Sequence, residues 1–176
     1  MSPIASPDQT ASARIRAGNV SDGRDRAAAI ELINRYASGL AGRMQPLSES
    51  VISSLIKDLP GLTNCRVFLA EVGDRPVGVA MCFVGYSTFK GAALLNIHDL
   101  AIHPDFQRRG IGSQLLTAVI EYAREQKFCH VTLEVQADNP ARLLYARHGF
   151  KVLDVPVDPL VTLFGKLALD EVAGVE

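Results

Sequence analysis

The sequence has few cysteines and no excess of charge of either sign, and both absences exclude classes of protein. Its three cysteines, Cys65, Cys82 and Cys129, are an odd number, widely spaced, and each lies in an apolar run. They predict neither a disulfide framework nor a CxxC metal pair, and indicate reduced thiols in a reducing compartment. The 18 basic and 19 acidic side chains leave a net charge of −1. No overall basic field therefore argues for nucleic acid or an acidic membrane surface as partner.

Long apolar segments are also missing. No apolar run approaches the roughly 18 residues expected of a membrane span. The opening residues, MSPIASPDQTAS, lack the basic region and apolar core of a signal peptide. We expect residues 1–12 to be a disordered leader, because they are rich in Ser, Pro and Ala without a period. Residues 13–176 are then expected to form one domain with a sizeable core, in a cytoplasmic protein.

Periodicity predicts a mixed sheet covered by helices. Ser21-Asp22-Gly23 is expected to cap a first helix, Ser48 a second, and Gly149 to end a later helix in a left-handed conformation. Three strands in succession favour an antiparallel half, and a strand–helix–strand passage favours a parallel half. The expected elements are a strand at 13–16, helices at about 22–38 and 48–59, strands at 65–72, 77–88 and 91–104, a helix at 111–126, a strand at 130–136, a helix at 139–149 and a strand-rich end closing with 161–169.

The stretch HPDFQRRGIGSQLL, residues 103–116, places Gly110 and Gly112 between an expected strand and an expected helix. A helix start leaves unpaired N–H groups and partial positive charge, which together can hold a phosphate. The glycines lack a Cβ and let a ligand approach the backbone, and Arg108 and Arg109 can add charge-assisted contacts. On this pattern alone, an anion site and a plain strand-to-helix turn are equally open.

The sequence of this stretch does not match either of two common nucleotide-binding motifs. A Walker loop requires GxxxxGK[ST], and QRRGIGSQ has neither the lysine nor its spacing. A dinucleotide fingerprint requires GxGxxG with an acidic residue about 20 residues later, and GIGSQL has leucine at the third glycine position. Glu134 lies at about the right distance, but the antiparallel strands that precede the motif do not fit that fold.

QRRGIG instead resembles the (Q/R)xxGx(G/A) motif of the GNAT family of N-acetyltransferases. HDLAIHPDFQRRGIGSQLL is similar to the family's strand four, loop and helix three, and TLEVQADNPARLLYARHGF is similar to its strand five and helix four. This block covers about residues 96–152, and the element order over 13–169 is similar to the family order. The resemblance implies an α/β (α+β) fold of three α-β-α layers, with a mixed, mostly antiparallel, twisted sheet of six to seven strands and about four helices.

The resemblance also implies that acetyl-CoA is the acyl donor. No metal is expected, because His103, His148 and the scattered carboxylates have no metal-ligand spacing. In the family the loop amides hold the pyrophosphate, strand backbone pairs with the pantetheine arm, and strands four and five splay apart to admit the thioester. Carried over to this sequence, the implied cofactor-binding residues are Leu100, Ala101, Ile102, Gln107, Arg108, Arg109, Gly110, Ile111, Gly112, Ser113, Asn139 and Tyr145.

Two proton transfers are required in such a reaction. Tyr145 matches the family's usual general acid, which protonates the departing thiolate, although a phenol pKa of ~10 against a thiol pKa of ~8.5 demands good geometry. His98 is our candidate general base, because the ordinary imidazole pKa of ~6.5 suits the task. Asp99, Glu134 and water stay open as alternatives. Since neighbouring strand side chains point to opposite faces, only one of His98 and Asp99 is expected to face the cleft.

Together these residues imply an N-acetyltransferase that moves acetyl from acetyl-CoA to a primary amine of a small molecule or peptide, by direct attack in a ternary complex. The alternative is a non-catalytic acyl-CoA-binding regulatory module of the same fold, against which Tyr145 and Asn139 weigh. The acceptor stays open, and Tyr86 and Phe89 are equally interpreted as acceptor contacts or as solvent-facing turn residues. The oligomeric state also stays open, with a homodimer as one alternative because dimers are common in the family.

Overall fold

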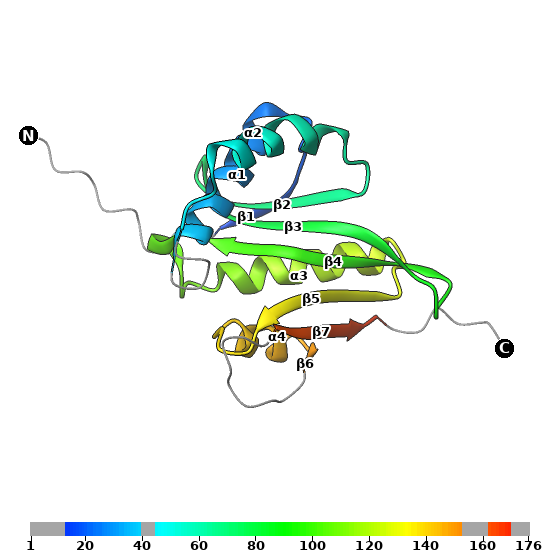
Figure 1. The fold of residues 1–176 in the computed structure, drawn as a ribbon. Helices are drawn as coiled ribbons and strands as arrows, with labels where there is room; N and C mark the ends of the chain where they lie inside the picture. The colour runs from blue at the N-terminus through cyan, green and yellow to red at the C-terminus, as the bar shows by residue number, and fades with distance from the viewer. Residues whose placement is uncertain (1–12, 40–44, 153–161, 170–176) are drawn as a thin grey trace, which may run out of the picture.

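The computed structural model describes residues 13–39, 45–152 and 162–169, and the expected leader at 1–12 lies outside them. Seven strands form one sheet in the order β1-β2-β3-β4-β5-β7-β6 (Figure 1). The elements, in chain order, are β1 (Arg14–Gly18), α1 (Gly23–Ser38), α2 (Glu49–Asp58), the 3-10 turn η1 (Leu59–Gly61), β2 (Cys65–Val72), β3 (Arg75–Ser87), β4 (Ala92–Ile102), the 3-10 turn η2 (Pro104–Phe106), α3 (Ile111–Glu125), β5 (His130–Gln136), α4 (Arg142–Arg147), β6 (Lys151–Val152) and β7 (Thr162–Ala168).

The sheet is mixed, as predicted. β1, β2, β3 and β4 pair antiparallel in succession, and β7 pairs antiparallel with both β5 and β6. Among the described strands only β4 and β5 run parallel, and their connection passes through α3, because parallel neighbours need a crossover. The expectation of a mostly antiparallel sheet of six to seven strands with about four helices is confirmed, with seven strands and four α-helices in the described ranges.

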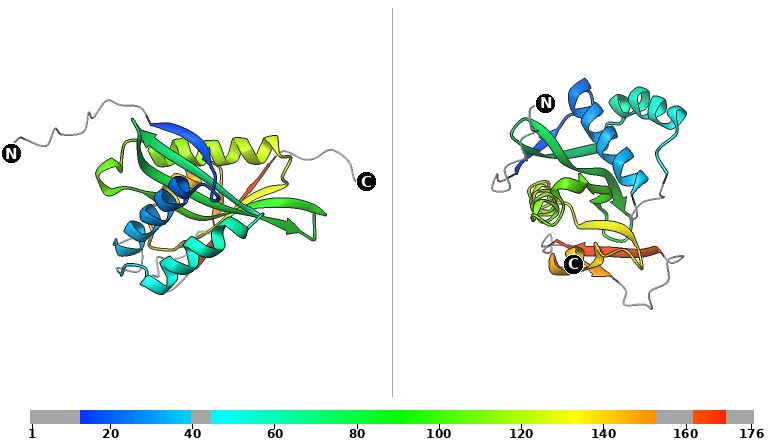
Figure 2. Two further views of the ribbon diagram at one scale, coloured as in Figure 1. Left: turned by 90° about the horizontal axis from the view of Figure 1, so that it is seen from above. Right: turned by 90° about the vertical axis from the view of Figure 1, so that its left-hand side faces the viewer.

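Helices cover both faces of the sheet. α1 and α2 lie over one face and α3 lies over the other (Figure 1, Figure 2). Each face of the sheet has its own apolar core, and β2 contributes to both because successive strand side chains point to opposite faces. Val67 and Leu69 pack with residues of α1 in the first core. Phe68 and Ala70 pack with residues of α3 in the second core. Tyr145 of α4 belongs to the second core. The three-layer α-β-α arrangement follows.

Three predicted helix boundaries are confirmed by their capping geometry. The Asp22 carboxylate accepts hydrogen bonds from the backbone N–H groups of Arg24 and Asp25, at 2.8 and 3.1 Å. The Ser48 hydroxyl accepts one from the backbone of Val51 at 3.3 Å. Gly149 has a φ of +84°, the left-handed conformation that glycine adopts most easily after a helix.

An ion-pair network with buried carboxylates and more exposed arginines ties the first helix to the sheet edge. The Arg16 guanidinium donates to Asp25 Oδ1 at 2.6 Å and to Glu71 Oε1 at 2.8 Å, and Arg14 donates to Glu71 Oε2 at 2.6 Å. The hydrogen bond from Arg16 holds the pKa of Asp25 below its ordinary value. Burial alone would raise the pKa of Glu71, but the two arginines outweigh burial and lower it. Each carboxylate is therefore charged in the folded protein at neutral pH.

Asp25→Asn is expected to lower the free energy of unfolding at pH 7 by about 2 kcal/mol, because it leaves the Arg16 guanidinium short of a charged partner. A carboxyl whose folded pKa is depressed stabilises the protein above its unfolded pKa of ~3.9, and that stabilisation is lost as pH falls through the folded pKa. The difference between the variant and the wild type should therefore shrink in acid. Urea unfolding from neutral pH down through the acidic range measures it.

Glu31→Gln is the matched control, because Glu31 forms an exposed i,i+4 pair with Arg35. It should change the unfolding free energy by no more than about 0.5 kcal/mol. Equal losses in the two variants, or a loss in Asp25→Asn that does not vary with pH, would contradict the assignment.

Candidate active site

β4 and β5 run side by side over a short distance and then separate. Their parallel pairs are Leu95–Val131, Asn96–Thr132 and Ile97–Leu133, although β4 continues to Ile102 and β5 continues to Gln136. A cavity of about 230 Å³ lies where the strands have parted, between residues 97–100 of β4 and residues 134–136 of β5. We call this cavity the strand cleft. The expected splay of these two strands is confirmed.

A larger groove of about 550 Å³ adjoins the strand cleft and is called here the glycine-loop groove. Its walls are residues 107, 108 and 110–113 on one side and residues 139–141 with α4 on the other. Tyr36, Leu100, Asn139 and Tyr145 line both the groove and the cleft. The two cavities therefore meet at these four side chains.

The start of α3 provides the polar end of the groove. Gly110 is the residue before the helix, with a φ of +78° and no side-chain cap, and a Cβ built there would meet nothing within 4 Å. A Cβ at Gly112 would lie 3.4 Å from the Leu144 side chain. The first N–H groups of a helix lack intrahelical partners and carry partial positive charge. An anion such as a pyrophosphate therefore fits this end of the groove.

The two arginines of the loop have different surroundings. Arg108 lines the groove and has a φ of +63°, a conformation uncommon for a residue with a side chain. Arg109 donates to the carbonyl of Asp105 at 2.7 Å, and its guanidinium lies 4.9 Å from the ring centre of Phe106. Arg109 is not among the residues that line the groove. Only the backbone of Arg109 is therefore available to bind the cofactor, whereas Arg108 can also contribute the charge of its side chain.

The side chains of the three strand residues expected to bind the cofactor do not all point toward the groove. Leu100 and Ile102 line the groove, whereas the side chain of Ala101 is only 2% exposed and packs in the core beneath α1. Only the backbone of Ala101 is therefore available to a ligand at this edge. The side chain of Gln107 donates to the Ile102 carbonyl at 3.1 Å, and Ser113 Oγ lies 2.7 Å from His148 Nε2.

α4 places Tyr145 at the junction of the cavities. Its side chain packs against Phe150, with ring centres 6.0 Å apart. Burial, with a smaller contribution from Tyr36, raises the pKa of Tyr145 to about 12. Nearby, Asn139 Oδ1 accepts a hydrogen bond from the Ala141 backbone at 2.9 Å. This bond fixes the direction of the amide at the junction.

Tyr36 is a site residue that no motif in the sequence indicates. It lies in the last turns of α1 and its side chain forms a hydrogen bond with Asn139. Burial raises the pKa of Tyr36, and the bond to Asn139 partly offsets that rise. No local signal predicts this contact, because it depends on how α1 crosses the sheet toward the segment before α4.

A β-bulge in β4 brings His98 and Asp99 into the strand cleft together. Met81 of β3 is opposite Asp99 and Cys82 is opposite Ile97, so His98 is the extra residue of the bulge. Both His98 and Asp99 line the cleft. The expectation that only one of them would face it is wrong, because regular alternation fails at a bulge.

The environments of these two residues differ. His98 is exposed, with its ring centre 5.6 Å from that of Phe83. Asp99 is partly buried, and burial raises the pKa of its carboxyl, with the charge of His98 acting in the opposite direction. Glu134, the remaining acidic candidate, also lines the cleft and is exposed. All three side chains considered as bases therefore share one cavity.

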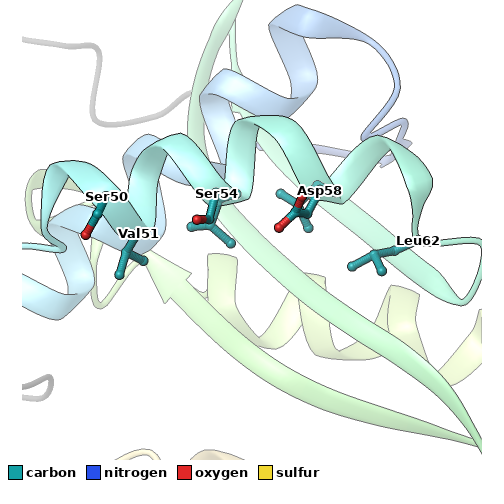
Figure 3. Close-up of a pocket in the computed structure, with 7 residues that line it drawn as sticks. Ser50, Val51, Ser54, Asp58 and Leu62 are labelled. Atoms are coloured by element: carbon teal, nitrogen blue, oxygen red, sulfur yellow. The ribbon is translucent and has the colours of Figure 1, made fainter.

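Other parts of the described chain offer less chemistry. A hollow of about 250 Å³ runs along α2, with Ser50, Ser54, Asp58 and Leu62 among its lining residues (Figure 3). None of its described lining residues belongs to the cleft or the groove, and Asp58 is the one ionisable side chain among them. Within the described ranges, no group of His, Cys, Asp and Glu side chains could hold a metal ion. No helix there has the length and apolar character to cross a membrane.

Comparisons with known proteins agree with this geometry. The model of the acetyltransferase (GNAT) family matches residues 40–150. An uncharacterised N-acetyltransferase of Methanocaldococcus jannaschii is 34% identical over 90 residues, which are 50% of this chain and 40% of that protein. Streptothricin acetyltransferase A of Bacillus subtilis is 42% identical over 65 residues, 36% of each protein. The chain thus spans well under two thirds of the length of these curated relatives.

A solved structure shows the same fold. The PaiA N-acetyltransferase of Thermoplasma acidophilum, in complex with coenzyme A, has a TM-score of 0.64 and 16% sequence identity. The match covers 90% of this chain and 99% of that chain. At this identity the likeness concerns the fold.

Proposed function

Because this chain belongs to the acetyltransferase (GNAT) family, we propose that it transfers the acetyl group of acetyl-CoA to a primary amine of a small molecule or peptide. One observation carries the proposal: the glycine-loop groove meets the strand cleft at Tyr145 and Asn139. One end of this continuous space suits a pyrophosphate. The other end holds a phenol and several groups that accept protons.

Acetyl-CoA is assigned to the groove by the match between its parts and the groove walls. The pyrophosphate belongs at the backbone of residues 107–113, with the charge of Arg108 beside it. The pantetheine arm belongs along β4 at residues 100–102, where β5 no longer pairs, in the manner of an added strand. The Ile102 carbonyl accepts the Gln107 side chain, so Leu100 and Ala101 are the better placed backbone contacts. The thioester then reaches the junction with the cleft.

The reaction makes a C–N bond and breaks a C–S bond, with one proton leaving the amine and one reaching the sulfur. Tyr145 is the proposed source of the second proton. With a pKa of about 12, its hydroxyl stays protonated throughout the neutral range. Because an ordinary thiol pKa is ~8.5, Tyr145 stabilises the developing thiolate as a hydrogen-bond donor before any proton moves.

Asp99 and His98 are the proposed route for the proton of the amine. An ammonium has no lone pair, so the nucleophile must be deprotonated before it attacks. A carboxylate whose pKa is raised by burial is a better proton acceptor near neutral pH than an ordinary one. We assign Asp99 as the acceptor and the exposed His98 as the group that passes the proton to solvent.

Three broader proposals accompany the activity. Residues 13–176 form one domain, supported by the sheet that joins β1 to β7. The protein is cytoplasmic, supported by its three cysteines, which are all free thiols.

The protein is also a homodimer, a proposal supported by two apolar side chains of α2, Val51 and Ile56, which are 43% and 50% exposed. Size-exclusion chromatography with light scattering tests the dimer.

An amine library assayed for thiol release from acetyl-CoA tests the activity. Release that depends on the amine, with a product heavier by one acetyl group, is the expected result. Binding of acetyl-CoA without release for any amine would overturn the enzyme proposal and support the regulatory module.

Gly110→Val is expected to weaken CoA binding by at least about tenfold, because a β-branched residue disfavours the left-handed backbone that shapes the loop. Gly73→Val is the matched control: Gly73 has a φ of +61° and open space around its Cβ position, in the turn between β2 and β3. Titration calorimetry should give wild-type affinity for the control. Unchanged affinity in Gly110→Val would remove the pyrophosphate from this loop.

Tyr145→Phe is expected to lower kcat about 100-fold with little change in acetyl-CoA affinity, because the proton donor is lost while the ring remains. Tyr122→Phe is the control, since the Tyr122 hydroxyl accepts from Arg66 at 2.8 Å away from both cavities. It should cost about 1 kcal/mol of stability and leave kcat unchanged. A wild-type rate in Tyr145→Phe would remove this residue from the mechanism.

Asp99→Asn is expected to lower kcat and to remove the acidic limb of its pH profile. The active form needs Asp99 ionised, so wild-type kcat at saturating amine should rise as pH rises through the raised pKa of this carboxyl. His98→Gln should keep the limb and lose less activity. Stopped assays across the acidic and neutral range give both profiles, and a limb that persists in Asp99→Asn contradicts the assignment.

A further inference from the structure

Glu134 is an acidic side chain of the strand cleft for which the proposed reaction has no use. Ile97 and Leu133 form the last pair between β4 and β5, so Glu134 is the first β5 residue beyond the point of separation. Its carboxylate accepts a hydrogen bond from Asn96 Nδ2, at 3.1 Å to Oε2. The same amide nitrogen lies 3.2 Å from Thr132 Oγ1. Glu134 is therefore oriented by a neutral amide while its charge remains available to the cleft.

Carboxylates outnumber basic side chains among the described residues that line the strand cleft. No lysine or arginine is among them: the acidic side chains are Glu134 and Asp99, and His98 is the one basic side chain. None of the ion pairs within the described ranges includes Glu134 or Asp99. The fold does pair buried carboxylates elsewhere, because Asp25 and Glu71 both receive arginines. A cationic group of a ligand can therefore pair with Glu134 without displacing a lysine or an arginine.

The carboxylate of Glu134 is not required by the amine that attacks the thioester. The amine reacts as a neutral nitrogen, and Asp99 is already assigned to take its proton. A carboxylate held beside the reacting position attracts a cation that persists through the reaction, because the partly enclosed walls focus its field. It also repels an acceptor that carries a carboxylate in place of this second cation.

We propose that the acceptor is a small molecule carrying a second cationic group besides the amine that is acetylated, and that Glu134 binds this second group. The proposal rests on the proposed acetyl transfer. The cavity of about 230 Å³ favours a compact molecule over a drug-sized one. Glu134 is thus a residue that determines specificity, and its contribution should appear in the affinity for the acceptor.

Three acceptors of matched length test the proposal: butylamine, 1,4-diaminobutane and 4-aminobutyrate. The diamine should have a kcat/KM at least about fivefold higher than the monoamine, and the amino acid the lowest. Glu134→Gln should abolish the advantage of the diamine by raising its KM, with kcat retained. Glu125→Gln removes the same charge from the end of α3, outside both cavities, and should keep the wild-type order.

A binding measurement separates this inference from the proposed function. With the protein saturated in CoA, calorimetry should show tighter binding of the diamine than of the monoamine in wild type and equal binding in Glu134→Gln. The inference is overturned by equal wild-type affinities, by a preference that survives in Glu134→Gln, or by a fall in kcat for all amines, which would make Glu134 the base. Selective diamine binding without thiol release for any amine would instead overturn the proposed function and leave the Glu134 site standing.

Discussion

Three backbone pairs between β4 and β5 hold the two halves of the sheet together, and the end of that pairing creates the site. Up to Ile97 and Leu133 the strands share a parallel ladder, and the apolar side chains of both pack against α3. Beyond this point the strands diverge, so the edge of β4 and the side chains of β5 face a common cavity. A longer ladder would fill this space with sheet. The groove, the cleft and their junction at Tyr145 all depend on where the ladder ends.

The remaining elements orient groups toward that opening. The bulge at His98 turns two neighbouring side chains into the cleft, and α3 directs its N-terminal end at the groove. α1 brings Tyr36 across to Asn139, and the network of Arg16, Asp25 and Glu71 anchors the start of that helix to the sheet edge. The ion-pair network at the start of α1 thereby helps to hold Tyr36, at the other end of this helix, where the groove meets the cleft.

Much of this arrangement could be predicted from the sequence, because it depends on local rules. Asp22, Ser48 and Gly149 mark helix ends through capping chemistry that acts within a few residues, and the spacing of Gly110 and Gly112 identified the loop. The contact of Tyr36 with Asn139 could not be predicted, because these residues are far apart in the chain and meet through the packing of α1. The bulge at His98 was also missed, since β4 there has no glycine or proline to signal it. The side-chain direction of Arg109 depends on Phe106 and was equally out of reach.

The central claim is that the glycine-loop groove binds a coenzyme A thioester and no other nucleotide cofactor. Thermal unfolding in the presence of acetyl-CoA, CoA, ATP or NAD tests it most directly, because a ligand that binds only the folded state raises the Tm by an amount that grows with the ratio of its concentration to its Kd. The account predicts a concentration-dependent rise with acetyl-CoA and with CoA, and none with ATP or NAD at the same concentrations. Stabilisation by ATP or NAD without stabilisation by CoA would contradict it.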